Sequence, residues 1–159
     1  MAAPWIAVAG PGAAEPADLE RAEEVGAAVA AAGAVLVCGG LGGVMEAACR
    51  GARAAGGLTV GLLPGDVREA ANEWVDVAIP TGLGEGRNVL VVRAASAVIA
   101  IGGGWGTLSE IALAMRARKP VVGLKSWMPM PPGGDQPGVI AADDPGAAVR
   151  AALAAASAA

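Results

Sequence analysis

The stretch from Ile101 to Glu110, IGGGWGTLSE, has the composition of a phosphate-binding turn. Its candidate ligand residues follow an apolar run and open a helix: Gly102, Gly103, Gly104, Trp105, Gly106 and Thr107. Glycines without a Cβ atom let the backbone turn tightly and approach a ligand. The unpaired N–H groups and the dipole of a helix start favour a phosphate. The stretch therefore predicts a phosphate site, to which the Thr107 hydroxyl adds a hydrogen bond.

Glu110 follows Gly106 by four residues. If the helix starts near Gly106, the Glu110 carboxyl group lies about one helical turn from the helix start and still faces the glycine-rich loop. The same spacing fits a capping box, in which Thr107 caps the helix and Glu110 stands three residues further on. The two roles are compatible, and three consecutive glycines exceed what a cap requires.

A second turn of the same type occupies Cys38 to Glu46, CGGLGGVME. Its candidate ligand residues also follow an apolar run: Gly39, Gly40, Gly42, Gly43, Met45 and Glu46. Two such turns strengthen the prediction, because ligands of open α/β sheets bind at the carboxyl ends of the strands. Glu46 has an alternative role, since a carboxylate in a first helical turn complements the helix dipole.

Two further segments are candidates for the same rim, by which we mean the edge of the sheet at the carboxyl ends of its strands. Arg87 and Asn88 open a predicted helix, where Arg87 can hold a phosphate or sugar hydroxyls bidentately, or can be a solvated helix-start residue. Gly10 and Pro11 follow the first apolar run and can close over one side of a nucleotide, or can form an ordinary strand-to-helix turn.

Short apolar runs alternate with longer helical stretches, a pattern typical of βαβ units and a parallel sheet. Strands are expected at 5–9, 34–38, 58–63, 75–79, 97–101 and 120–124, with an edge strand at 139–141. Helices are expected at 16–32, 44–55, 88–95, from near 106 to about 117, and from Asp144 onward. The 159 residues then form one nucleotide-binding domain, 1–159. Its predicted class is α/β, a Rossmann-like three-layer α/β/α fold with a mostly parallel sheet of six or seven strands.

Composition excludes several classes of chemistry. The chain has no His, which removes Ser-His-Asp and Cys-His nucleophiles and His-ligated metal sites. We expect no metal and no resident cofactor.

A formal charge of −4 without a basic run argues against nucleic acid as a partner. No uninterrupted apolar run reaches the roughly 18 residues of a membrane helix. Cys38 and Cys49 lie in apolar surroundings with no signal peptide before them, and are interpreted as reduced core thiols of a cytoplasmic protein.

With these residues together, the chain resembles the LOG ("Lonely Guy") or lysine decarboxylase-like family and the wider DprA/Smf-related Rossmann proteins. The family signature is PGGxGTxxE with an upstream arginine. Residues 102–110 match it with glycine in place of proline, and Arg87 matches the upstream arginine. Residues 39–46 match the family's second glycine turn. In detail the chain is most similar to a short, molybdenum-cofactor-carrier-like branch that is typified by GGRxGVME and GGGxGTLSE patterns.

The resemblance implies hydrolysis of the N-glycosidic bond of a nucleoside 5′-monophosphate, which releases the base and ribose 5-phosphate. Arg87 and Glu110 are then the catalytic pair, and the 102–107 turn seats the phosphate. The chemistry agrees, because a carboxylate can stabilise an oxocarbenium-like state and position water. Amino-acid decarboxylation would need pyridoxal phosphate and a Schiff-base lysine, whereas nothing around Lys119 or Lys125 resembles a cofactor cage.

Three functions remain open from the sequence. The first is a phosphoribohydrolase, and the second is a non-catalytic carrier or sensor of a nucleotide-like or molybdenum-cofactor-type molecule. The third, a DNA-processing accessory, lacks the basic and aromatic surface that it would need. Two helices carry apolar residues around much of their circumference, which with the resemblance predicts a homodimer or homotetramer. The sequence leaves open whether Trp105 stacks on the ligand or packs beneath the turn.

Overall fold

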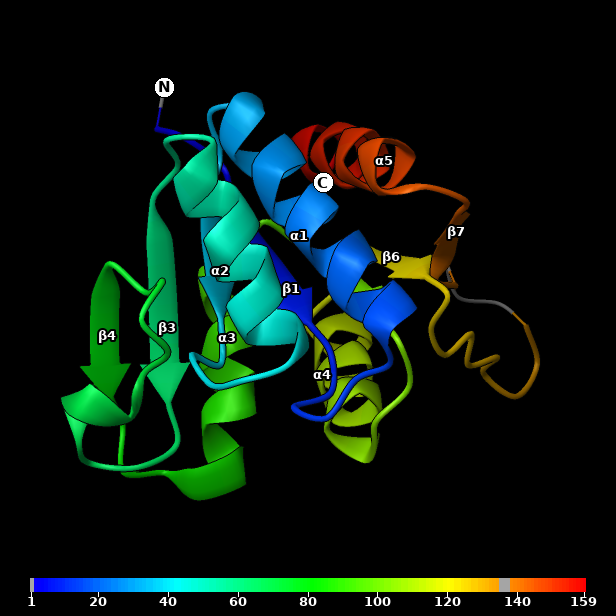
Figure 1. Ribbon diagram of the computed structural model, residues 1–159. Coiled ribbons are helices and arrows are strands. Elements are labelled where there is room, and N and C mark those ends of the chain that lie inside the picture. The colour runs from blue at the N-terminus through cyan, green and yellow to red at the C-terminus, as the bar shows by residue number, and fades with distance from the viewer. Residues whose placement is uncertain (1, 135–137) are drawn as a thin grey trace.

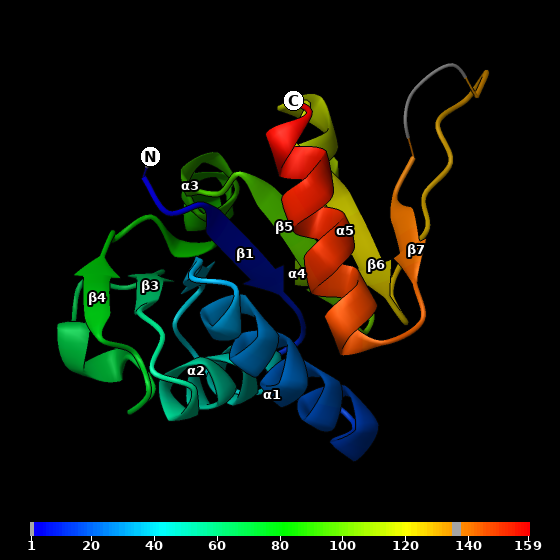
Figure 2. The same ribbon diagram turned by 90° about the horizontal axis from the view of Figure 1, so that it is seen from above.

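The structure is a computed structural model that describes residues 2–134 and 138–159. Within these residues the chain forms one sheet of seven strands, all of them parallel (Figures 1 and 2). The strands are β1 (Trp5–Ala9), β2 (Val35–Cys38), β3 (Thr59–Leu63), β4 (Val77–Pro80), β5 (Ala97–Ile101), β6 (Val121–Leu124) and β7 (Ile140–Ala142). Their order across the sheet is β4-β3-β2-β1-β5-β6-β7.

Helices cover both faces of this sheet and make three layers. One face carries α1 (Pro16–Ala31), α2 (Val44–Ala54) and α5 (Pro145–Ser157), and the opposite face carries α3 (Asn88–Ala94) and α4 (Trp105–Arg116) (Figures 1 and 2). Two short 3₁₀ turns, η1 (Arg68–Ala70) and η2 (Gly84–Arg87), complete the described elements. The predicted Rossmann-like three-layer α/β/α class is confirmed.

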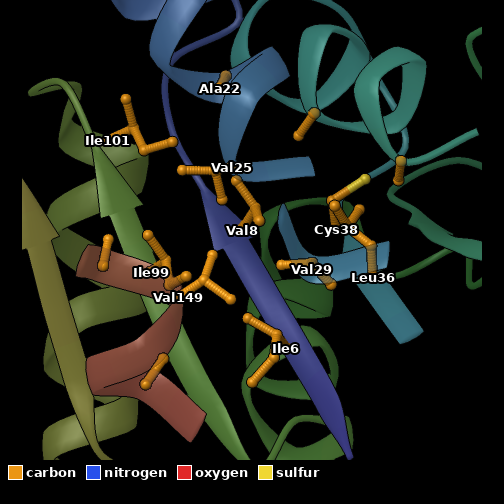
Figure 3. Close-up of a cluster of buried hydrophobic side chains, with 14 of the residues drawn as sticks. Ile6, Val8, Ala22, Val25, Val29, Leu36, Cys38, Ile99, Ile101 and Val149 are labelled. Carbon is orange, nitrogen blue, oxygen red and sulfur yellow. The ribbon is translucent and has the colours of Figure 1, made fainter. Parts of the chain in front are cut away.

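The core consists of two apolar layers, one on each side of the sheet. Strands β3 and β5 are buried along their whole length, as expected where helices cover both faces of a parallel sheet. Figure 3 shows one layer, in which Ile6, Val8 and Ile99 of the strands face Val25 and Val149 of the helices.

The strand order reverses between β1 and β5, which are direct neighbours. From β1 the chain continues outward through β2, β3 and β4, whereas from β5 it continues in the other direction through β6 and β7. Loops that leave the two central strands therefore diverge, and the edge at such a reversal is where ligands bind in open α/β sheets. The pairing of Ala9 with Ala100 brings the Gly10 and Gly102 turns to the same edge.

Five strands differ from the sequence prediction by one or two residues at a boundary. Strands β2, β3 and β6 each begin one residue later than expected, at Val35, Thr59 and Val121. The strand expected at 75–79 is Val77–Pro80. Val75 lies before this strand, and its side chain packs over Gly61. Pro80 is tolerated because β4 is an edge strand, where a missing N–H group is not needed. The edge strand expected at 139–141 is Ile140–Ala142. No helix in the described part of the chain is long and apolar enough to cross a membrane.

Candidate functional site

The three glycine-bearing turns of the sequence meet around Pro11. The N–H group of Val44, at the start of α2, donates a hydrogen bond of 3.1 Å to the Pro11 carbonyl. A Cβ atom on Gly43 would lie 2.3 Å from that carbonyl oxygen, and one on Gly104 would lie 3.3 Å from the Pro11 Cβ. The turn that follows β1 therefore contacts both the turn after β2 and the turn after β5.

The helix that follows the Gly102–Gly104 turn begins earlier than expected. Gly104 is the N-cap and α4 starts at Trp105, so Thr107 lies inside the first turn and does not cap the helix. The capping-box alternative for Thr107 and Glu110 is therefore wrong. The Thr107 side chain is only 2% exposed, and its hydroxyl has no hydrogen-bond partner among the residues that the structure describes.

An unpartnered buried hydroxyl is uncommon, and it calls for a ligand or another polar partner. The Thr107 hydroxyl lies close beneath the turn, 3.6 Å from the position that a Cβ of Gly104 would take. A Cβ on Gly106, by contrast, would meet no atom within 4 Å. The start of α4 thus combines open space, free helix-start N–H groups and the Thr107 hydroxyl, which has no hydrogen-bond partner among the described residues.

Arg87 is buried between the second turn and α3, so its solvated alternative is wrong. One terminal nitrogen donates to the Asn88 side-chain oxygen, and the other donates to the Gly39 carbonyl over 3.4 Å. A Cβ on Gly39 would lie 2.5 Å from this nitrogen and 2.9 Å from the Met45 sulfur, so only glycine leaves room for the guanidinium. The Nε of Arg87 is buried without a partner among the described residues.

Asn88 joins this cluster to the first turn of α4. Its amide group donates a hydrogen bond of 3.1 Å to the Ser109 hydroxyl, which in turn donates to the Gly106 carbonyl over 2.8 Å. The start of α3 and the start of α4 are thereby held together. Asn88 acts here by positioning, and its buried side chain fixes the Arg87 guanidinium at the same time.

Glu110 is 7% exposed, one turn further along α4. Burial raises the pKa of this carboxyl to about 7, and the nearby Arg87 guanidinium opposes the rise. The carboxyl group therefore exchanges its proton near neutral pH, which suits a group that must act as an acid or a base. Arg87 and Glu110, 23 positions apart in the sequence, lie near enough for the guanidinium charge to act on the pKa of the carboxyl group.

Two predicted residues lie at the margin of this cluster. Glu46 bends back over the second turn, with an oxygen 3.8 Å from the position of a Gly42 Cβ. Trp105 is 78% exposed, so the alternative in which it packs beneath the turn is wrong. Its ring lies beside Trp127, with 5.4 Å between the ring centroids and 32° between the ring planes.

Three residues that sequence reasoning missed support the turns. The Asn72 amide donates to the Leu41 carbonyl over 2.8 Å and to the Gly40 carbonyl over 3.4 Å. The Trp127 indole N–H donates to the Gly104 carbonyl over 3.2 Å, and an Asp18 oxygen lies 2.8 Å from the position of a Gly102 Cβ. Trp127 stands three residues after β6, and its place beyond a strand end was a usable signal. Asn72, in an irregular loop, offered none.

Two pockets of the molecule lie away from the predicted residues. The larger of these two, of about 1130 Å³, lies beside α4 and is lined by Leu108, Met115, Arg116 and Met130 among others. Within residues 2–134 and 138–159, no three His, Cys, Asp or Glu side chains are grouped so that they could hold a metal ion. The Cys38 and Cys49 thiols are free and buried, 3.5 Å apart.

Comparison with known proteins identifies the family. The model of the SLOG cluster4 family matches residues 3–149. The chain belongs to the SLOG cluster4 family. The matched region includes the three glycine-bearing turns, Arg87 and Glu110, so the resemblance to LOG-type proteins is confirmed.

Solved structures similar to this SLOG chain cover it almost completely. The molybdenum cofactor binding protein from Rippkaea orientalis is 39% identical with a TM-score of 0.87, over 97% of this chain and 98% of that chain. The molybdenum cofactor carrier protein from Chlamydomonas reinhardtii is 35% identical with a TM-score of 0.85, over 98% and 99%.

A third relative is similar over a shorter stretch. The cytokinin riboside 5′-monophosphate phosphoribohydrolase of Mycobacterium tuberculosis is 43% identical over 97 residues, which are 58% of this chain and 51% of that protein. The match therefore spans about half the length of the mycobacterial enzyme.

Proposed function

We propose that this chain binds the phosphate of a nucleotide-like molecule at the start of α4, and that it is a nucleoside 5′-monophosphate phosphoribohydrolase. The observation that carries the binding proposal is the Thr107 hydroxyl, which is buried and unpartnered among the described residues at the N-terminus of a helix. Such a terminus already favours an anion through its free N–H groups and its dipole. The hydroxyl supplies a further donor to a phosphate oxygen.

Buried Glu110 beside Arg87 supports the hydrolytic step. Cleavage moves positive charge onto the ribose C1′ and ring oxygen as the bond to the base nitrogen breaks. Ionised Glu110 stabilises that charge and accepts a proton from the attacking water, whose oxygen bonds to C1′. The base leaves with the bonding electron pair and takes up a proton. Arg87, held by Gly39 and Asn88, is positioned to favour the ionised carboxylate and to contact the sugar or phosphate.

A second candidate function is that of a carrier which binds without turnover. The observation in its favour is the extent of the likeness: the Rippkaea and Chlamydomonas molybdenum-cofactor proteins match this chain over 97% and 98% of its length. The mycobacterial phosphoribohydrolase matches 58%. Gly102 also replaces the proline of the LOG signature. In this function the same turns would hold the phosphate of a molybdenum-cofactor-type cargo, and Glu110 would not need to ionise.

We further propose that the chain acts as a homodimer or homotetramer in the cytoplasm. We propose a small molecule as its ligand, and neither nucleic acid nor a membrane. Leu83, directly before η2, and Leu90, on α3, leave apolar surface exposed near the buried Arg87, where a second copy can cover it. The formal charge of −4 disfavours nucleic acid. Light scattering at micromolar concentration tests the assembly, and a monomer would contradict it.

The deciding experiment measures base release and binding in parallel. The protein is incubated with AMP and with an isoprenyl-adenosine monophosphate, and the free base is quantified by chromatography. We expect release by the wild type, loss of release in Glu110→Gln with binding retained, and near-normal release in the control Glu24→Gln, whose carboxyl group is exposed on α1. Binding without any release by the wild type over hours, at high enzyme concentration, would favour the carrier. Absence of binding to every phosphate ester would refute both functions.

A further inference from the structure

Trp105 occupies an unusual position for a large apolar side chain. It is the first residue of α4, directly after the glycine turn, and it is 78% exposed. Tryptophan is highly buried on average in folded proteins. Core packing therefore does not account for this side chain, and its place between Gly104 and Gly106 links it to the proposed phosphate site.

The exposed Trp105 indole lies against a second aromatic ring. One side of it lies beside Trp127, with ring centroids 5.4 Å apart and a tilt of 32°. Trp127 is itself anchored, because its N–H group donates to the Gly104 carbonyl over 3.2 Å. Its Nε1 also lies 3.6 Å from the position of a Gly103 Cβ. Trp127 thus connects the ring of Trp105 to the turn, and Trp105 needs little further ordering when a ligand binds it.

We propose that Trp105 is the stacking platform for the planar heterocyclic ring of the phosphate ester that the α4 N-terminus holds. The inference rests on the proposed phosphate site and applies to either candidate function. Trp105 is the first residue of α4, next to the helix-start N–H groups that would hold the phosphate, so a ring joined to that phosphate can lie over the indole. The space beside this helix start is open, since a Cβ on Gly106 would meet no atom within 4 Å.

The ligand class follows from this chemistry: a phosphate monoester that carries a flat, conjugated ring system, such as a purine nucleotide or a pterin phosphate. An indole face stacks on any flat π-system with little regard to its hydrogen-bonding groups. Recognition by Trp105 therefore selects for the presence of a ring and not for one base. A phosphorylated sugar without a ring would bind through the turn alone.

The test uses the intact chain and two probes, AMP and ribose 5-phosphate, which differ by the ring. We expect Trp105→Ala to weaken AMP binding about tenfold or more and to leave ribose 5-phosphate within about twofold of the wild type. Trp105→Phe keeps a flat ring and should retain AMP affinity within about threefold. Tryptophan fluorescence gives an independent readout: AMP should quench the wild type, and Trp105→Phe should bind AMP with most of that quenching lost.

Each result decides the inference. If the wild type binds both probes and Trp105→Ala binds both as the wild type does, or loses both equally, the platform is wrong and the phosphate site stands. If Trp105→Ala lowers the mass found by light scattering without a selective loss of AMP, the indole contacts a second copy of the chain, and the platform is again wrong. If the wild type binds neither probe, the proposed function fails and the inference fails with it.

Discussion

The two glycine-rich turns of this protein look alike in sequence and differ in what surrounds them. In the turn after β2, a Cβ on Gly39 would lie 2.5 Å from Arg87, and one on Gly43 would lie 2.3 Å from the Pro11 carbonyl. In the turn after β5, a Cβ on Gly103 would have its nearest neighbour at 3.6 Å, and one on Gly106 would have none within 4 Å.

Glycine therefore has two uses in one molecule. After β2 it lets other parts of the chain approach the backbone, so this turn positions Arg87 and Pro11. After β5 it leaves space, which a ligand can occupy. Gly102 and Gly104 are exceptions in the second turn, because Gly102 has a φ of +69° and a Cβ on Gly104 would lie 3.3 Å from the Pro11 Cβ.

The largest expected effect breaks the packed turn. Gly43→Ala places a methyl group against two backbone carbonyls, at 2.3 and 2.4 Å, at a residue whose φ is +67°. We expect the free energy of unfolding to fall by about 3 kcal/mol or more in urea denaturation. Gly42→Ala is the matched control, because its nearest neighbour lies at 3.8 Å, and it should stay within about 1 kcal/mol of the wild type. Equal losses in both variants would refute this account of the turn.

The next effect is an increase in stability when the buried Glu110 carboxyl group is removed. Burial raises the pKa of Glu110 to about 7 in the folded chain, above that of the unfolded chain. The ionised form is therefore disfavoured in the folded state, and the penalty is absent below the unfolded pKa and complete above about pH 7. Glu110→Gln should be more stable than the wild type by about 1–3 kcal/mol at pH 8.

The pH dependence is the check on that prediction. Denaturation of Glu110→Gln and wild type should converge as the pH is lowered to 4, where Glu110 is protonated in both states. Glu46→Gln, on the same rim, controls for the loss of a carboxylate. A difference for Glu110→Gln that stays constant from pH 4 to pH 8 would mean that the raised pKa is not its cause.

A smaller effect concerns the support of the open turn. Trp127→Phe removes the indole N–H that donates to the Gly104 carbonyl, and should lower the free energy of unfolding by about 1 kcal/mol. Trp5→Phe is the control, since its indole makes no side-chain hydrogen bond within the described part of the chain. A neutral Trp127→Phe in thermal denaturation would show that this hydrogen bond does not hold the turn.

The smallest expected effect on stability is that of Gly106→Ala, which also tests whether glycine leaves space for a ligand in the turn after β5. Gly106→Ala lies in the first turn of α4 with open space around its Cβ, so it should stabilise the fold by about 0.5–1 kcal/mol through helix propensity. The same methyl group takes space that we assign to the ligand, and AMP affinity should fall about tenfold. Calorimetric titration that finds unchanged AMP affinity would mean that this opening is not the ligand's place.

Much of the fold was predictable because secondary structure depends on nearby residues. The alternation of apolar runs with helical stretches located the strands to within one or two residues, and the partly exposed edge strand β4 was placed least well. The glycine turns, Arg87 and Glu110 were identified from spacing and from the LOG resemblance. The start of α4 at Trp105 was not, because three preceding glycines permit a helix to begin at several residues.

The sequence by itself determined the α/β class, the phosphate-binding composition of the turns after β1, β2 and β5, and the absence of histidine chemistry. Tertiary structure decided the rest: the reversal of strand order between β1 and β5, the burial of Arg87 on a carbonyl 48 residues away, and the pairing of Trp105 with Trp127. It also decided that the Thr107 hydroxyl is left unpartnered within the described residues. The reason is physical, since backbone hydrogen bonds and side-chain periodicity are local, whereas burial and side-chain contacts depend on which distant segments the folded chain brings together.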